Sequence, residues 1–238
     1  MGPSKVVLIT GCSRGIGLGF VRYFVKHNWK VLATCRTPHE AVELKKVLQD
    51  HNQTEIIQCD VSFDDSIEAC YQSVLTLGIT HLDLLINNAG TSNDKHPFEN
   101  PSRMKRDEFH RILDVNATGL AMVTNRFIPL LQAAADPLVV NIGSMFGTVS
   151  MVDVLTCASY RCSKSCLNML TSLYALEFSD IGFLALHPGW VQTDLGGKNP
   201  KPPLTVAESV GKMSEVIAAF DKTKSGQFWS LDGYQLDP

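Results

Sequence analysis

The sequence predicts a single α/β domain over residues 1–238, in which seven parallel strands form a doubly wound sheet with helices on both faces. Short apolar, β-branched runs alternate with longer stretches of helical periodicity, as in βαβ units. Runs such as Val6–Ile9 and Leu82–Ile86 are apolar throughout, which is typical of parallel strands buried on both faces. No internal repeat, low-complexity segment or linker divides the chain, and 238 residues can form one large domain.

Each element is placed by its local pattern. Strands are expected at Val6–Thr10, Lys30–Cys35, Glu55–Gln58, Leu82–Ile86, Leu138–Ile142, Gly182–His187 and Gln227–Trp229. Helices are expected at Gly15–His27, Glu40–His51, Asp64–Leu77, Arg106–Ala134, Tyr160–Phe178 and Val206–Phe220. The first helix would turn a stripe of Ile16, Phe20, Val21 and Phe24 towards the core. The fourth contains Pro129, which lacks an N–H and is expected to disturb the helix there.

Composition excludes several classes of function. The formal net charge is −3 with both signs interspersed, so no basic surface for nucleic acid is expected. The seven cysteines are irregularly spaced and form no CxxC pair, which favours reduced thiols of an intracellular protein over a disulfide framework. No metal site is expected. No apolar run reaches the roughly 18 residues that span a membrane, and we expect a cytoplasmic protein without membrane contact.

A glycine-rich turn follows the first strand. Gly11, Gly15 and Gly17 precede the first helix, where a doubly wound (Rossmann) sheet binds the pyrophosphate of a dinucleotide. Glycines let the backbone approach the phosphates, and the helix N-terminus supplies N–H donors. The alternative is a turn that only reverses the chain.

The end of the second strand indicates which dinucleotide is bound. Sites for NAD usually place an acidic residue there to hold the ribose 2′-hydroxyl, but this strand ends in Ala33-Thr34-Cys35-Arg36. Arg14 adds a second cation in the glycine-rich turn. Two guanidinium groups suit a 2′-phosphate, so NADP(H) is the expected cofactor. Arg36 could instead be a solvated loop charge, but the missing acid would remain.

Tyr160 and Lys164 are a candidate acid/base pair. Residues four apart lie one turn apart on one helix face. An ammonium near a phenol stabilises the phenolate, which eases proton transfer to a carbonyl oxygen. Taken singly, each is more simply explained as an ordinary helix residue. Beside a dinucleotide motif, and with Ser144 upstream, they indicate carbonyl chemistry.

Nearly the whole chain resembles the short-chain dehydrogenases/reductases. The matching residues are Thr10–Gly17, Asp60-Val61, Asn87-Asn88-Ala89-Gly90, Asn116, Ser144, Tyr160 with Lys164, and Pro188-Gly189 with Thr193. Two further segments, Gly189–Gly197 and Gly226–Gly233, are similar to those of sniffer-type carbonyl reductases and C-factor-like proteins.

The resemblance implies roles for named residues. Asn116, Ser144, Tyr160 and Lys164 would be catalytic: Tyr160 donates a proton, Lys164 also binds the ribose, Ser144 bonds the substrate oxygen and Asn116 holds a relay water. With Tyr160 and Lys164, the cofactor would contact Gly11, Ser13, Arg14, Gly15, Ile16, Gly17, Arg36, Asp60, Val61, Asn88, Ala89, Gly90, Pro188, Gly189, Val191 and Thr193. His187 is expected to be structural.

The expected activity is NADPH-dependent reduction of an aldehyde or ketone. One alternative is an NADP(H)-binding signalling or regulatory protein whose turnover is incidental, and another is a hydroxysteroid or alcohol dehydrogenase using the same site. Loop composition favours an apolar or aromatic carbonyl, bound by three segments that carry Phe98, Met145, Phe146, Trp190 and Leu195. Two long helices, Arg106–Ala134 and Tyr160–Phe178, are surfaces that the resembled family uses for homodimers. The step of sixteen residues from Ser144 to Tyr160 is longer than is common there, which predicts either an altered substrate loop or an effect on oligomerisation.

Overall fold

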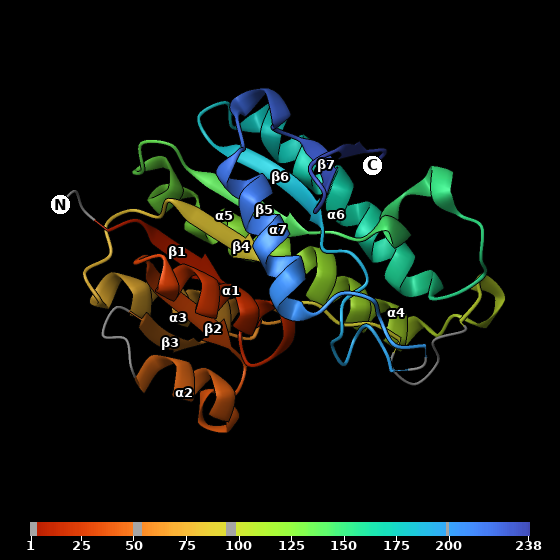
Figure 1. Cartoon of the computed structure of the whole chain (residues 1–238), viewed down its shortest axis with the longest axis horizontal. Helices are drawn as coiled ribbons and strands as arrows, with labels where there is room; N and C mark the ends of the chain where they lie inside the picture. Colours follow the sequence, from red (N-terminus) through yellow and green to blue (C-terminus); the bar gives the residue numbers. More distant parts are fainter. Residues whose placement is uncertain (1–3, 50–53, 94–98, 199) are drawn as a thin grey trace.

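A single sheet with helices on both faces forms the molecule (Figure 1). The computed structural model describes residues 4–49, 54–93, 99–198 and 200–238. The strands are β1 (Val6–Ile9), β2 (Lys30–Cys35), β3 (Thr54–Gln58), β4 (Leu84–Asn87), β5 (Leu138–Ile142), β6 (Gly182–His187), β7 (Gln227–Ser230) and β8 (Gln235–Leu236). The expected α/β fold is confirmed, with eight strands in place of seven.

The strand order is β3-β2-β1-β4-β5-β6-β7-β8. Strands β1 to β7 are parallel, and β8 pairs antiparallel with β7 through Phe228 opposite Leu236. The sequence prediction missed β8 because two residues carry no readable periodicity. The order reverses between β1 and β4, and this switch point is where open α/β sheets bind ligands.

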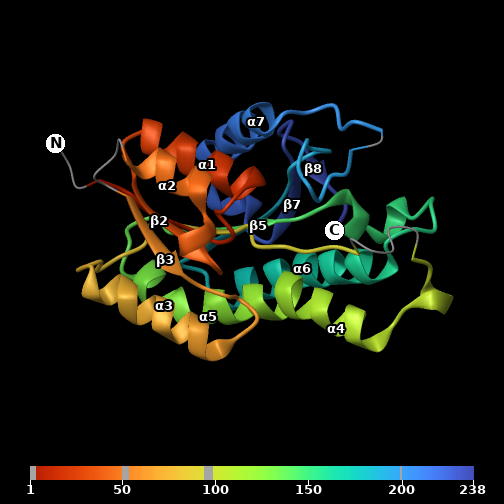
Figure 2. The same cartoon turned by 90° about the horizontal axis from the view of Figure 1, so that it is seen from below.

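Helices cover the two faces in separate layers (Figure 2). One layer consists of α1 (Gly15–Lys26), α2 (Val42–Gln49) and α7 (Val206–Ala218), whose apolar residues pack on one side of the sheet. The other consists of α3 (Asp64–Thr76), α4 (Arg106–Leu113), α5 (Gly119–Gln132) and α6 (Ala158–Glu177). Because both faces are covered, the central strands are apolar at nearly every position.

The long fourth helix changes its geometry at a different place from the one expected. Residues Asp114–Thr118 form a turn of π-helix between α4 and α5, whereas Pro129 lies inside α5, which continues to Gln132. The disturbance expected near Pro129 does not end the helix there. Gly119 follows the π-helical turn, and a Cβ there would lie 2.4 Å from the Val61 carbonyl oxygen, so this helix packs directly on the segment after β3.

A buried polar network joins the centre of the sheet to α5 and α6. Asn87 Nδ2 in β4 donates to Thr124 Oγ1 (3.0 Å) and to Asn141 Oδ1 in β5 (2.9 Å). Asn141 Nδ2 in turn donates to Thr171 Oγ1 of α6 (2.9 Å). Buried amides are costly unless bonded, so these contacts hold α6 in one position against the sheet.

Candidate active site

The glycine-rich turn packs directly against the loop that follows β4. Gly11 has φ +71°, and a Cβ there would lie 2.9 Å from Ala89 Cα. Asn88 Nδ2 donates to the carbonyl oxygens of Thr10 (2.8 Å) and Gly11 (3.2 Å). Thr10 Oγ1 accepts from the backbone N–H groups of Asn88 and Ala89, a role that sequence reasoning missed. The two loops on either side of the switch point thus form one unit.

The first turn of α1 is suited to an anion. It has no side-chain cap at Arg14 and no acidic residue, so its N–H groups and positive dipole end are not already neutralised by a carboxylate. Gly17 must be glycine, because a Cβ would lie 2.4 Å from the Gly11 carbonyl oxygen. Gly15 has φ +60°, and Ser13 and Ile16 are half-buried in the same turn. These features fit the pyrophosphate of a dinucleotide.

The two candidate 2′-phosphate ligands are both exposed. Arg36 lies directly after β2. Arg14 Nε lies 3.0 Å from Asp194 Oδ2, an ion pair that joins the glycine-rich turn to the segment after β6. Asp60 lies after β3, where its Oδ1 accepts from the Ser62 N–H (3.1 Å), and Val61 beside it is buried.

Tyr160, Ser144 and Lys164 lie together at the start of α6. Tyr160 and Lys164 are both buried. Burial raises the pKa of Tyr160 to about 12, and a hydrogen bond with Ser144 opposes part of this rise. Burial lowers the pKa of Lys164 to about 8. The Lys164 Nζ donates to the Ile142 carbonyl oxygen at the end of β5 (2.8 Å) and lies 5.7 Å from the centre of the Tyr160 ring.

Asn116 lies in the π-helical turn and is buried. Its Oδ1 accepts from the Thr91 N–H (2.8 Å), and its Nδ2 donates to the Thr91 carbonyl oxygen and to Ser163 Oγ (both 2.9 Å). A Cβ at Gly90 would lie 3.5 Å from Asn116 Oδ1 and 4.0 Å from Lys164 Nζ. The Asn116 amide therefore joins the loop after β4 to α6. Sequence reasoning did not identify Thr91 and Ser163 as its partners.

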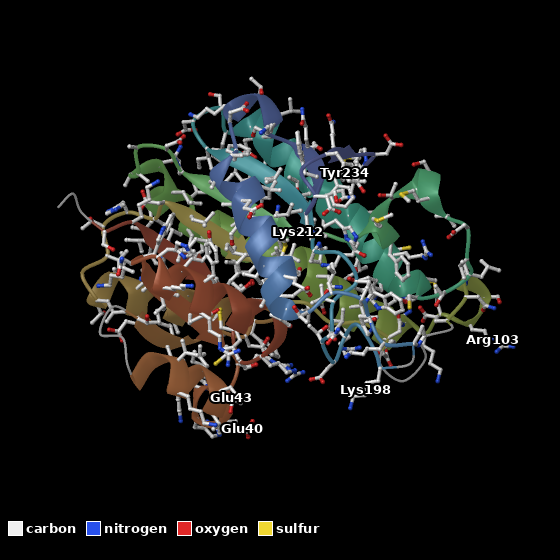
Figure 3. All side chains as sticks on the ribbon, in the orientation of Figure 1. Glu40, Glu43, Arg103, Lys198, Lys212 and Tyr234 are labelled. Atoms are coloured by element: carbon white, nitrogen blue, oxygen red, sulfur yellow. The ribbon has the colours of Figure 1, made fainter. Side chains whose placement is uncertain are left out.

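The segment after β6 lies beside the glycine-rich turn. Gly189 has φ +77°, and Ser209 Oγ of α7 donates to the Pro188 carbonyl oxygen (2.6 Å). Val191 is buried, and Thr193 lies beside the glycine-rich turn, with its Cγ2 3.4 Å from a Cβ built on Gly15. Lys198 in this segment and Arg103 both point outwards (Figure 3).

His187, at the end of β6, supports the Ser144 segment. Its Nδ1 accepts from the Met145 N–H at 3.4 Å. Burial lowers the pKa of His187 to about 4, although Asp232 opposes this shift, so the ring is neutral at pH 7. This contact agrees with the structural role expected for His187.

The long step from Ser144 to Tyr160 contains two short 3-10 turns, Met145–Gly147 and Val149–Met151, and then swings away from the sheet (Figure 1). Between it and α6 lies an apolar groove of about 240 Å³, lined mainly by Phe146, Val149, Val152, Val154, Leu155, Arg161 and Cys162. Neither Tyr160 nor Ser144 lines this groove. Phe146 faces it, Trp190 instead bonds its own loop through Gly196, and Phe98 lies outside the described residues.

Two features that matter for chemistry therefore lie at one edge of the sheet. One is a helix N-terminus suited to a dinucleotide, and the other is a Tyr–Ser–Lys group in which Tyr160 and Lys164 are buried. A family model described as short chain dehydrogenase matches residues 5–203, and the chain belongs to this family of oxidoreductases. The resemblance read from the motifs is confirmed.

Among solved structures, the chain is similar to an NADPH-bound carbonyl reductase from chicken fatty liver. The identity is 33%, the TM-score is 0.91, and the match covers 98% of this chain and 99% of that one. It is also similar to the carbonyl reductase Sniffer of D. melanogaster, with 28% identity, a TM-score of 0.91, and coverage of 99% and 100%. An NADPH-dependent pterin aldehyde reductase of Arabidopsis thaliana is 28% identical over 81% of this chain and 77% of that protein.

Across the described residues, none of the helices combines the length and the apolar character needed to cross a membrane. None of the seven cysteines, all of which lie in the described part of the chain, forms a disulfide, and Cys162 is exposed on α6.

Proposed function

We propose that this protein is an NADPH-dependent carbonyl reductase in which Tyr160 is the general acid. The observation that carries the proposal is the packing of the buried Tyr160 and Lys164 beside the half-buried Ser144, which is hydrogen-bonded to Tyr160. This group lies beside Gly90 at the switch point where the chain presents the N-terminus of α1. A carbonyl carbon held there would lie between a hydride donor and a proton donor.

Residues of four loops would hold the cofactor. The N–H groups at Ser13–Gly17 would bind the pyrophosphate, Asn88–Gly90 and Pro188–Thr193 would border the nicotinamide, and Asp60-Val61 would contact adenine. When bound, the reduced nicotinamide supplies the hydride. Arg14 and Arg36 favour NADPH, because nothing acidic ends β2. The similar proteins from chicken and Arabidopsis, whose names include NADPH, support this preference.

The chain's residues would manage the proton. As the hydride reaches the carbonyl carbon, the C=O π electrons move to oxygen, and the Tyr160 O–H transfers its proton there. Ser144 would donate to the same oxygen. A pKa near 12 keeps Tyr160 protonated but makes it a weak acid. The nearby Lys164 ammonium would stabilise the phenolate, which solvent reprotonates; in this proposal Asn116 supports the relay through its π-helical turn.

An apolar or aromatic aldehyde or ketone is the proposed substrate. The support is that two apolar residues, Met145 and Leu195, lie in the segments that follow Ser144 and Thr193. We also propose that the protein forms a homodimer in the cytosol. The outer face of α6 exposes Met169 (61%), Leu173 (53%) and Leu176 (83%) at spacings of four and three, an apolar stripe typical of a helix that packs on another.

The test is a carbonyl panel assayed in parallel with NADPH and NADH. We expect turnover with NADPH on reactive dicarbonyls, quinones or aromatic aldehydes. Tyr160→Phe should lower kcat by about 10² to 10⁴, the usual contribution of general acid catalysis, while NADPH binding by fluorescence is retained. Tyr23→Phe is the matched control, because Tyr23 is a half-buried tyrosine of α1 stacked on His27.

No NADPH oxidation with any carbonyl, or full turnover by Tyr160→Phe, would reject the reductase. NADPH binding without turnover would support a regulatory protein instead. Faster oxidation of a hydroxysteroid with NADP⁺ than reduction of any carbonyl would support the alcohol dehydrogenase.

A further inference from the structure

Helix α6, which carries Tyr160 and Lys164, begins without a cap of its own. Its first residue is Ala158, and the preceding Cys157 makes no side-chain bond to the helix. Cys157 has φ +50° and ψ +43°, a left-handed backbone conformation that residues other than glycine, asparagine and aspartate rarely adopt. The first hydrogen bond within the helix runs from the Arg161 N–H to the Cys157 carbonyl oxygen (2.9 Å). The N–H groups of the first turn before Arg161 therefore need acceptors from elsewhere.

Glu99 supplies two of those acceptors from a distant part of the chain. Its Oε2 accepts from the Ser159 N–H at 2.8 Å, and its carbonyl oxygen accepts from the Ala158 N–H at 3.2 Å. Glu99 is 6% exposed and Ser159 is fully buried, so water does not compete for these bonds. A carboxylate at a helix N-terminus is also favoured by the helix dipole. Glu99 thus caps α6 although it is 60 residues away in sequence.

The cap lies one residue from Tyr160. The Ser159 N–H donates the bond to Glu99, and Tyr160 follows Ser159 as the third residue of the helix. The Tyr160 side chain must also meet Ser144, which comes from a different segment after β5. A shift of the first turn by about 1 Å is enough to cost a reaction about 100-fold.

We propose that Glu99 is a positioning residue for the reaction: it holds the first turn of α6, and thereby Tyr160, in register with Ser144. This inference rests on the proposed carbonyl reductase activity. Glu99 directly precedes Asn100 and the η2 turn (Pro101–Arg103), so it also joins that segment to α6.

Three variants test the bond. Glu99→Ala removes the acceptor, and we expect kcat to fall about 10- to 100-fold, while the NADPH dissociation constant changes less than about threefold. Glu99→Gln keeps an oxygen at the same reach and should recover most of the lost kcat. Cys157→Gly in the Glu99→Ala background relaxes the left-handed residue and should recover part of the lost kcat. Arg103→Ala is the control from the same segment, because the Arg103 side chain points to solvent.

Hydrogen exchange gives a readout that does not depend on turnover. The amide of Ser159, which loses its side-chain acceptor, should exchange about tenfold faster in Glu99→Ala than in the unchanged protein, and near the original rate in Glu99→Gln. Wild-type kcat in Glu99→Ala with unchanged exchange at this amide would overturn the proposal. So would equal losses of kcat in the alanine and glutamine variants. If Glu99→Ala does not fold, Glu99→Asp, whose shorter side chain cannot reach Ser159 in the same geometry, takes its place with the same expectations.

The two proposals fail in different ways. An unchanged protein without carbonyl turnover rejects the reductase, and the exchange rates then still decide whether Glu99 caps α6. Turnover in the unchanged protein, combined with an insensitive Glu99→Ala, rejects the positioning role alone.

Discussion

At the scale of single residues, the site depends on two groups whose pKa values burial shifts apart. Burial raises the pKa of Tyr160 to about 12 and lowers that of Lys164 to about 8. The first shift keeps the phenol protonated. The second reduces the cost of burying the Lys164 amine, which donates to the Ile142 carbonyl oxygen. The residue types and their spacing were predictable from sequence. Their burial was not, because it depends on loops from three other parts of the chain.

Burial of the Lys164 ammonium should therefore lower the stability of the fold. Lys164→Met removes a buried ammonium but leaves the Ile142 carbonyl oxygen without this donor, so we expect unfolding free energy at pH 7 to rise by about 1 to 2 kcal/mol. A lysine has a pKa near 10.4 when unfolded, so the unfolded state binds more protons between about pH 8 and 10.4, and stability of the unchanged protein should rise with pH there. The advantage of Lys164→Met should shrink across the same window.

Urea unfolding at pH 7 and pH 10 checks this expectation. Lys212→Met is a suitable control, because Lys212 is on the surface in an ion pair with Asp232. A Lys164→Met protein that is less stable at pH 7 than the unchanged protein would contradict the cost assigned to burial.

At the scale of elements, the site depends on where α6 is held along its length. Glu99 caps its first turn, the Asn87–Asn141–Thr171 network fixes its middle, and the segment after Ser144 crosses it at Gly147. Ser165 Oγ donates to the Gly147 carbonyl oxygen at 2.6 Å. The expected helix began at Tyr160, two residues late, because Cys157 and Ala158 carry no capping signal. A cap supplied by Glu99 cannot be recognised from a local pattern.

The crossing at Gly147 should tolerate no side chain. A Cβ there would lie 2.7 Å from the Lys164 carbonyl carbon and 2.8 Å from its oxygen, both backbone atoms that cannot turn aside. We expect Gly147→Val to separate the Ser144 segment from α6 and to lower kcat at least about tenfold, with a smaller effect on NADPH binding.

Steady-state kinetics and NADPH fluorescence titration measure both effects. Gly211→Val is the control, because a Cβ at Gly211 meets no atom within 4 Å. Equal activity in the two variants would mean that the crossing does not set the position of Ser144.

At the scale of the whole molecule, α6 holds the buried Tyr160 and Lys164 and also has an exposed apolar face. The stripe Met169, Leu173 and Leu176 lies on α6, and the exposed Val149 (73%) and Leu155 (70%) line the apolar groove beside its N-terminal half. A surface of this kind is unusual on a monomer and supports the proposed homodimer.

The homodimer has a direct test. Sedimentation of the unchanged protein should give twice the chain mass of 26.2 kDa, and Leu173→Glu should give that mass itself because a carboxylate on the stripe would be buried without a partner. Val42→Glu, on an exposed residue of α2 away from the stripe, should remain dimeric. A monomer at every concentration of unchanged protein would reject the interface.

The sequence by itself determined the order of strands and helices, the glycine-rich turn and the residue types of the site, because each leaves a local pattern. Strands β2, β5 and β6 begin and end where the pattern predicts. The tertiary structure decided what those residues touch. The π-helical turn at Asn116, the ion pair of Arg14 with Asp194, the groove outside the cleft and the cap from Glu99 all join segments distant in sequence. The physical reason is that periodicity reports which face of an element is buried, whereas contacts between loops depend on how the whole sheet brings the ends of its strands together.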